Sequence, residues 1–488
     1  MGSFGSRNLA PALFLLILGP GSASPAADAP LASAAERGDR AEIRRLIEGH
    51  ADVNGAQPDG MTALHWAAHR DDLEGATLLV AAKADAKATN RFGVTPLSMA
   101  CTNGNRAMVE LLLEAGADPD TRLRGGETAL MTAARTGTIG PVKALIARGA
   151  DVNARERRGQ TALMWAAAEG QAEVVAELIR AKADFKAPLP SGFSPLAFAV
   201  REGQTEVVRV LLGAGADVNE AMQPRQSSGK APSRGTSPLI LAVENGHFEL
   251  AVVLLEAGAD PNDQRSGFTP LHMLTWVRKP NRGDGDDGDP APIGSGSLGS
   301  LAFVAKLVER GADVNARLKR GASGRGVLNR AGATPFLLAA MTADVPLMRT
   351  LLAHGADPRI PNVDHSTPLM AAAGLGCLAP EEEAGTEPEA IEAVALTLEL
   401  GNDLDAVDDN GETAMHGASY KNLPAVVQFL ADRGAKAEVW NREDKYGWTP
   451  QAIAEGHRPG NFKPSPPTLA ALLRVLAPTG STTTPPAR

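Results

Sequence analysis

The stretch ETALMTAARTGTIGPVKALIARGADVNARERRG, from Glu127 to Gly159, decides the fold of this chain. Its Thr-Ala-Leu start recurs as a Thr/Ser-Ala/Pro-Leu triplet every 33 residues, and Gly-Ala-Asp or a related tripeptide follows each triplet about 20 residues later. A fixed period of this length is typical of a solenoid, in which each repeat is one small structural unit. The triplets with this spacing begin at Thr62, Thr95, Thr128, Thr161 and Ser194.

The residue types within one repeat predict two short helices followed by an extended loop. Thr128 supplies a capping hydroxyl at the start of the first helix, and Gly137 ends that helix. Pro141 suits the first turn of the second helix, and Gly149 allows a left-handed turn out of it. Apolar residues recur at helical spacing in both helices. One such pair cannot bury both sides of its apolar face, so neighbouring repeats must stack.

Several repeats carry a more specific pattern. TALHWAA (Thr62 to Ala68), TPLHMLT (Thr269 to Thr275) and TAMHGAS (Thr413 to Ser419) resemble the TPLHxAA helix signature of the ankyrin repeat family. GADVNA, at Gly149 to Ala154 and Gly311 to Ala316, resembles the entry into that family's β-hairpin finger. The resemblance extends over roughly residues 31–476. It implies an all-α solenoid of helix pairs with β-hairpin fingers, about twelve units in all, with irregular units at both ends.

The residues before the array have the features of a bacterial export signal. Arg7 is their only positive charge, Leu9 to Leu18 form an apolar segment of about ten residues, and the small residues from Gly21 to Ala26 suit cleavage. We therefore expect a signal peptide at residues 1–26 and a short linker at 27–30. The mature protein is expected to be exported, either periplasmic or secreted. Because the apolar segment is too short for a stable anchor, we expect no membrane span.

The regular spacing breaks four times in the later half of the chain. Because a stacked core tolerates no insertion, the extra residues are expected in loops. One insertion separates two helices of a single unit, Thr269 to Lys279 and Ser300 to Arg310, and its deletion is expected to cost little stability. Within another, Thr386 and Glu389 resemble a capping box. Residues 477–488 are expected to form a disordered tail. The insertions lie near residues 223–235, 280–297, 318–332 and 378–387.

No motif for catalysis or cofactor binding occurs in the chain. The nine histidines accompany no recurring nucleophile, and neither a G-x-S-x-G elbow nor a phosphate-binding glycine motif is found. The acidic stretch GDGDDGD, Gly283 to Asp289, offers oxygen ligands for calcium but lacks EF-hand spacing, which favours a solvated loop. We therefore expect no enzymatic activity, no cofactor and no metal.

Histidines also occur within the helix signature. His65 and His69 lie one helical turn apart, which is a metal-ligand spacing in principle. The family resemblance instead implies that His65, with His272 and His416, has a structural role in hydrogen bonds between units.

One face of the first helices carries large apolar residues. The position after the signature histidine holds Trp66, Met99, Thr132, Trp165, Phe198, Leu241, Met273 and Leu338 in successive units. These side chains could pack between repeats, as large residues at this position do in the family. They could also contact a partner, because aromatic residues and Met are enriched in interfaces. Among them, the candidate partner anchors are Trp66, Trp165 and Phe198.

The fingers are basic although the net charge of the chain is −9. Stacking would bring them side by side into a basic ribbon, with the acids on the helices, and such a ribbon attracts anionic partners. Exposed loops also collect charge without any function, and that alternative stays open. The candidate binding residues on the fingers are Arg122, Arg124, Arg155, Arg157, Arg158, Arg317, Lys319 and Arg320.

Binding is therefore the function that the sequence favours. The leading hypothesis is an exported, monomeric scaffold that binds a partner protein, acidic if the basic ribbon is used, through the concave surface of fingers and first helices. The first alternative is a binder of an anionic envelope polymer or glycan. The second is an enzyme with a site in an inserted loop. Nucleic acid is not an expected partner.

Overall fold

The computed structural model describes residues 29–225, 233–280, 291–322, 324, 326–380, 382–458 and 463–477. The predicted signal peptide, the stretch Gly283 to Asp289 and all but the first residue of the predicted tail lie outside these residues. The described residues belong to two compact units. The N-terminal unit contains residues 29–217 and 223–225, and the C-terminal unit contains residues 218–222 and the described residues from 233 to 477.

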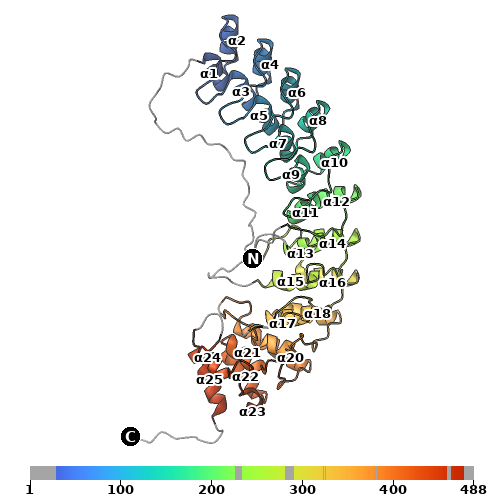
Figure 1. Ribbon diagram of the computed structural model, residues 1–488, viewed down its shortest axis with the longest axis vertical. Helices are drawn as coiled ribbons and strands as arrows, with labels where there is room; N and C mark the ends of the chain where they lie inside the picture. The colour runs from blue at the N-terminus through green and yellow to red at the C-terminus, as the bar shows by residue number, and fades with distance from the viewer. Residues whose placement is uncertain are drawn as a thin grey trace, which may run out of the picture. The chain divides into compact units, whose positions relative to one another are not determined.

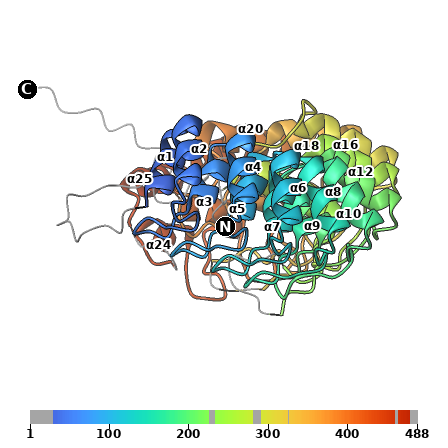
Figure 2. The same ribbon diagram turned by 90° about the horizontal axis from the view of Figure 1, so that it is seen from above.

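The N-terminal unit consists of six helix pairs (Figure 1). The first helices of successive pairs contact one another in order, and so do the second helices. Second helices, first helices and fingers therefore form three layers (Figure 2). The first helices are α1 (Pro30–Arg37), α3 (Ala63–His69), α5 (Pro96–Asn103), α7 (Ala129–Thr136), α9 (Ala162–Ala168) and α11 (Pro195–Arg201). The second helices are α2 (Arg40–Glu48), α4 (Leu73–Ala81), α6 (Arg106–Glu114), α8 (Ile139–Ala147), α10 (Ala172–Arg180) and α12 (Thr205–Gly213).

The C-terminal unit repeats this arrangement with six further pairs and one short extra helix, α23 (Ala437–Trp440). The twelve pairs of the described chain agree with the predicted number of repeats. The first helices are α13 (Pro238–Glu244), α15 (Pro270–Arg278), α17 (Pro335–Met341), α19 (Pro368–Ala372), α21 (Ala414–Tyr420) and α24 (Pro450–Ala454). The second helices are α14 (Phe248–Glu256), α16 (Ser300–Glu309), α18 (Val345–Ala353), α20 (Glu387–Glu399), α22 (Pro424–Asp432) and α25 (Pro466–Leu476).

The helix boundaries follow from the residues that the sequence singled out. Thr128 caps α7 by accepting a hydrogen bond from the amide of Met131, and Gly137 ends α7 with φ 78°. Gly149 has φ 85°, the predicted left-handed turn. Helix α8 begins at Ile139, so Pro141 is its third residue and lies in the first turn, as expected. Local residues thus set the ends of α7 and the turn after α8, and stacking buries the apolar sides.

The fingers contain turns and isolated β-bridges rather than extended strands within the described residues. Backbone hydrogen bonds instead join one finger to the next. The amide of Arg91 donates to the Asp59 carbonyl at 2.9 Å, and the amide of Arg157 donates to the Gly125 carbonyl at 3.0 Å. These bonds fix the spacing between the tips of neighbouring fingers.

The end of the insertion between α15 and α16 contacts a neighbouring repeat. The two helices do form one pair, as predicted. The insertion's last residues, however, bind the start of α14: the amides of Ser297 and Leu298 donate to Oε1 of Glu249 at 2.7 and 3.1 Å. The amide of Ser295 donates to Nδ1 of His247 at 2.8 Å. Glu249 is exposed whereas His247 is buried, and the expected small cost of deleting the insertion stays a prediction.

The described helices are short, and none has the length and apolar character needed to cross a membrane.

Candidate partner-binding surface

The signature histidines link successive repeats. Nδ1 of His65 accepts a hydrogen bond from the Thr62 amide at 3.2 Å, and its Nε2 donates to the Val94 carbonyl of the next repeat at 3.0 Å. His272 and His416 make the same two kinds of contact. Burial lowers the pKa of His65, and it lowers the pKa of His272 and of His416 to about 4. The predicted structural role of these residues is confirmed.

The inner face of the first helices differs between the two units. At the position after the signature histidine, Trp66, Met99 and Trp165 are partly exposed in the N-terminal unit. The equivalent residues of the C-terminal unit are buried; Leu241 is 2 % exposed and Leu338 is fully covered. These three side chains can therefore reach a partner, whereas Thr132 and Phe198 at the same position of this unit are only 8 % and 5 % exposed.

The two exposed tryptophans are held by their neighbours. Nε1 of Trp66 donates to Oε1 of Gln57 at 2.7 Å, and the Trp66 ring meets His69 edge-on with 5.7 Å between ring centroids. The Arg135 guanidinium lies 5.4 Å from the centroid of Trp165. Nε1 of Trp165 is buried without a hydrogen-bond partner. Both rings are thus fixed in place with part of their surface uncovered.

Phe198 lies in the same row but offers little surface. Its side chain is 5 % exposed and packs against Phe193, with 5.2 Å between ring centroids. The Arg201 guanidinium covers it from 5.3 Å. Phe198 therefore serves mainly the packing of α11, and little of it can contact a partner.

The finger arginines of the N-terminal unit form an interlocking ladder. Arg157 donates from Nη2 to the Arg124 carbonyl at 3.1 Å, and Arg124 donates from Nη2 to the Arg91 carbonyl at 2.5 Å. Arg122 donates from Nη1 to the Arg155 carbonyl at 3.1 Å. These side chains remain exposed, so the ladder holds a row of positive charges in fixed positions along the fingers.

Arg158 is exposed, and its side chain makes no contact of the ladder kind within the described residues; its backbone amide donates to Oε1 of Glu156. Its charge can therefore be changed without loss of a side-chain contact.

Acids are present on the fingers as well, contrary to the expectation that the helices would carry them. Asp85, Asp118, Asp151 and Asp184 lie exposed where each finger leaves its second helix. Their carboxylates accept hydrogen bonds from nearby amides; Oδ1 of Asp151, for example, accepts from the Asn153 amide at 2.9 Å. The basic ribbon is therefore confined to the outer part of the fingers.

The basic residues of the C-terminal unit have a different setting. Nη2 of Arg317 donates to the Pro361 carbonyl at 2.9 Å, and the amide of Lys319 donates to the Gly267 carbonyl at 3.0 Å. The side-chain carbons of Arg320 lie against Gly267. All three side chains are exposed on the inserted finger.

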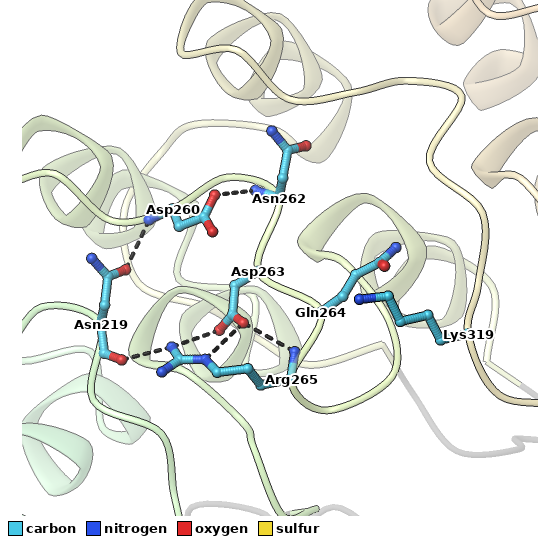
Figure 3. Close-up of a pocket in the computed structure, with 7 residues that line it drawn as sticks. All are labelled: Asn219, Asp260, Asn262, Asp263, Gln264, Arg265 and Lys319. Atoms are coloured by element: carbon cyan, nitrogen blue, oxygen red, sulfur yellow. Dashed lines mark hydrogen bonds and ion pairs between the residues drawn. The ribbon is translucent and has the colours of Figure 1, made fainter.

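Lys319 also lines an open cavity of about 510 Å³ between fingers (Figure 3). Arg265 donates to both oxygens of Asp263 there, at 2.9 and 3.0 Å. Burial would raise the pKa of Asp263, but the hydrogen bonds and charge of Arg265 lower it below the usual range. Two acids and two bases share this cavity, so it has no net attraction for one sign of charge. Its lining residues are Asn219, Asp260, Asn262, Asp263, Gln264, Arg265 and Lys319.

The inserted finger covers the inner face of the C-terminal unit. Leu318 and Leu328 are each 5 % exposed and belong to a buried cluster with Leu338, Leu375 and Tyr420. The backbone of Leu328 approaches Gly376 so closely that an added Cβ there would lie 2.4 Å from the Leu328 nitrogen. The inner face beside Leu338 is therefore covered by the chain itself.

The end of the C-terminal unit buries three carboxylates together. Asp408, Glu412 and Asp444 are all nearly inaccessible, and the Tyr420 hydroxyl donates to Asp444 at 3.4 Å. Burial raises the pKa of Glu412 to about 8, and the charge of Asp408 adds to the effect. Oε1 of Glu412 is buried without a hydrogen-bond partner. The site thus favours the protonated form of Glu412.

No group of three or more His, Cys, Asp or Glu side chains within the described ranges has an arrangement that could hold a metal ion.

Comparison with known proteins identifies the repeat. A model for ankyrin repeats in three copies matches residues 5–90, 72–156 and 130–222. A model for many copies matches residues 239–276, and the single ankyrin repeat model matches residues 331–363. Together these matches cover more than half of the 488 residues.

Two curated proteins are similar to parts of the chain. The E3 ubiquitin-protein ligase KEG of Arabidopsis thaliana is 29% identical over 197 residues, which are 36% of this chain and 11% of the ligase. The putative ankyrin repeat protein FPV219 of Fowlpox virus (strain NVSL) is 29% identical over 125 residues, 22% of this chain and 29% of the viral protein. In both cases the chain matches less than a third of the relative's length.

Proposed function

Because the chain belongs to the ankyrin repeat family, we propose that it is a scaffold whose N-terminal unit binds an acidic partner protein through its inner helices and basic fingers. The observation that carries this proposal is the difference between the inner faces of the two units. Trp66, Met99 and Trp165 are partly uncovered, whereas Leu338 and its C-terminal equivalents are buried. In this proposal the N-terminal unit makes the contact with the partner protein, and the C-terminal unit has a structural role.

The tryptophans would act as anchors. A large aromatic ring that is already fixed loses little conformational freedom when a partner covers it, so most of its burial contributes to affinity. Trp66 and Trp165 are fixed in this way by Gln57 and Arg135. Because α5 and α7 lie between α3 and α9, the two rings would contact apolar side chains at two separate places on the partner.

The arginine ladder would supply attraction at a distance and select for acidic partners. Its guanidinium groups already donate to carbonyls of neighbouring fingers, yet each guanidinium keeps further N–H groups and its full charge. Positions fixed in advance lower the entropy lost on binding, and a row of like charges raises the rate of encounter with acids.

Capture with the full-length mature chain tests the proposal. The immobilised protein is incubated with envelope extract, and the double variant Trp66→Ala/Trp165→Ala is compared with wild type. We expect the variant to retain less than about a tenth of the captured partner, because hot-spot aromatics contribute about 2 kcal/mol or more each. The control is Arg209→Glu on α12, an exposed residue of an outer helix. Equal capture by the tryptophan variant and the control would refute the anchors.

An anionic envelope polymer or glycan is the second candidate, since the same basic ladder would attract it. Treating the extract with protease before capture separates the two: loss of the captured material supports a protein partner, and survival supports the polymer.

We also propose that residues 1–26 direct export. The support is the apolar segment Leu9 to Leu18 followed by small residues. N-terminal sequencing of the protein from the periplasmic fraction should find a start near Ala26. A cytoplasmic protein that still begins at Met1 would contradict export.

A further inference from the structure

Two rows of exposed arginines cross neighbouring fingers of the N-terminal unit. Arg91, Arg124 and Arg157 hold the same position of three successive fingers, 33 residues apart, and are called the first arginine row here. Arg122 and Arg155, also 33 residues apart, form the second arginine row. Each row therefore has one positive charge per repeat.

Equivalent hydrogen bonds give the side chains of each row the same setting in successive repeats. Nη2 of Arg124 and Nη2 of Arg157 each donate to the backbone carbonyl of the first-row residue one repeat earlier. Nη1 of Arg122 and Nη1 of Arg155 each donate to the carbonyl four residues ahead, at 3.4 and 3.1 Å. The guanidinium groups of a row are therefore spaced as the repeats are, at about the 8–10 Å that separates packed helices.

Positive charge dominates the outer part of these three fingers. Residues 88–94, 121–127 and 154–160 together contain six arginines and two glutamates. One of the glutamates, Glu156, is 8 % exposed, and its Oε1 accepts hydrogen bonds from two backbone amides. No carboxylate of the described residues forms an ion pair with an arginine of either row. The rows therefore offer their charge to an acidic partner.

A polyproline II helix has the period of these rows. It has three residues per turn and rises about 3.1 Å per residue, so every third side chain lies on one face, about 9 Å further along. In a β-strand the third side chain points to the opposite face, and the second and fourth lie about 7 and 13 Å away. An α-helix brings every seventh side chain to one face about 10.5 Å apart, but a short isolated helix is unstable in water, so its folding would oppose binding.

We propose that the first arginine row binds an acidic segment of the partner in the polyproline II conformation, with Asp or Glu at every third residue. This inference rests on the proposed function, because it specifies which part of the partner protein the basic fingers contact. Successive carboxylates on one face of the segment pair with Arg91, Arg124 and Arg157. Each guanidinium has N–H groups left for this after its bond to a carbonyl. The first row has three charges and the second row two, so the segment follows the first.

Two peptides of identical composition test the period. EPPEPPE has glutamates three residues apart, PEPEPEP has them two residues apart, and the prolines favour the polyproline II conformation in both. Fluorescence anisotropy of the labelled peptides measures the Kd of each for the full chain at about 50 mM salt. We expect EPPEPPE to bind about tenfold more tightly, because it aligns three carboxylates with the row whereas PEPEPEP aligns one. Equal affinities, or no saturable binding of EPPEPPE, would overturn the proposal.

Two single variants assign the contact to the first row. Arg124→Gln removes the middle charge of the row and should weaken EPPEPPE binding about fivefold. Arg158→Gln removes the same charge from an exposed residue outside both rows, and its Kd should stay within about twofold of wild type. Equal losses in the two variants would mean that net charge alone attracts the peptide, and would overturn the role of the period.

An α-helical segment is the remaining conformation to test. An alanine-based peptide of about 15 residues, with glutamates seven residues apart, presents the same three charges along one helix face. Tighter binding of this peptide than of EPPEPPE would overturn the polyproline II segment in favour of a helix.

Failure of this inference can be told apart from failure of the proposed function. If the two proline peptides bind equally while Trp66→Ala/Trp165→Ala still loses the captured partner, the periodic acidic segment is refuted and the scaffold function stands. If capture does not depend on the tryptophans, the proposed anchors fail whatever the peptides show.

Discussion

Arg278 and Asp344 join two repeats of the C-terminal unit through a two-pronged ion pair. Nε of Arg278 lies 2.7 Å from Oδ2 of Asp344, and Nη2 lies 2.9 Å from Oδ1. The Asp344 side chain is 1% exposed and also caps α18 by accepting from the Leu347 amide at 3.2 Å. Arg278 ends α15, directly before the insertion. The pair therefore secures the repeat that the insertion interrupts.

Replacing Arg278 by Met should lower the free energy of unfolding of the C-terminal unit by about 3 kcal/mol, because it leaves the Asp344 carboxylate buried without its counter-charge. Urea denaturation followed by circular dichroism measures the change. The control Arg349→Met removes a loose surface pair with Glu392, 3.6 Å apart, and should cost less than about 1 kcal/mol. Equal losses in the two variants would contradict the importance of the buried pair.

Lys83 and Lys182 occupy left-handed turns, with φ 71° and 67°, where other repeats have glycine. Lys83→Gly and Lys182→Gly should each raise the free energy of unfolding by about 0.5–1 kcal/mol, because glycine removes the steric cost of this conformation. The reverse test is Gly149→Ala, whose added Cβ would meet no atom within 4 Å and so reports the backbone effect alone. The midpoints of denaturation curves measure the change in stability for the lysine variants and for Gly149→Ala. A stabilising Gly149→Ala would refute the explanation.

Glu412→Gln should change how stability depends on pH. The pKa of Glu412 is raised to about 8 in the folded chain from 4.5, so its contribution is complete below pH 4.5 and is lost as the pH rises toward 8. Between these two pH values the free energy of unfolding falls by at most about 1.4 kcal/mol per pH unit. The variant should lack this slope and be more stable than wild type at pH 8. Denaturation between pH 5 and 9 measures it.

The groups that face Glu412 are Asp408, Asp444, Tyr420 and Lys445. The control is Glu127→Gln, which likewise precedes a capping threonine, Thr128, but is partly exposed. This variant retains Glu412 and should keep the fall in stability between pH 5 and 8. If wild type, Glu412→Gln and Glu127→Gln lost stability with pH in the same way, Glu412 would be ionised over the whole range from pH 5 to 9.

His272 should titrate in the opposite sense. Its pKa is lowered to about 4 from 6.5 by burial, so its contribution to stability is present above pH 6.5 and is lost as the pH falls through 4. Imidazole resonances followed by NMR should show His272 neutral at pH 5. A protonated ring at that pH would mean that the link between Thr269 and the Ala333 carbonyl is open.

The repeat and its boundaries could be predicted from sequence because they depend on local chemistry. Thr128, Gly137 and Gly149 each determine the backbone conformation at or next to their own position. The capping box of Thr386 and Glu389 is confirmed, because the Thr386 amide lies 2.8 Å from the Glu389 carboxylate. Periodicity then sets the number of pairs. These features need no knowledge of distant contacts.

The surfaces could not be predicted in the same way. Leu318 and Leu328 lie in an aperiodic insertion, and only the folded chain reveals that they cover the inner face beside Leu338. The burial of Phe198 depends on Phe193, which precedes its helix. The arginine ladder depends on the distance between neighbouring fingers, because each side chain donates to a carbonyl of a neighbouring finger. The residue type alone does not reveal these bonds. Whether Trp66 and Arg155 contact a partner stays a prediction.

The most direct test of the central claim compares two matched triple charge reversals in capture of the partner at about 50 mM salt, where screening is weak. One variant, Arg155→Glu/Arg157→Glu/Arg158→Glu, changes the N-terminal fingers, and the other, Arg317→Glu/Lys319→Glu/Arg320→Glu, changes the inserted finger of the C-terminal unit. We predict that the first lowers affinity about a hundredfold or more, with wild-type capture weakening steeply toward about 300 mM salt, and that the second stays within about threefold of wild type. Loss of capture in the second variant, or indifference to both, would contradict the assignment of binding to the N-terminal unit.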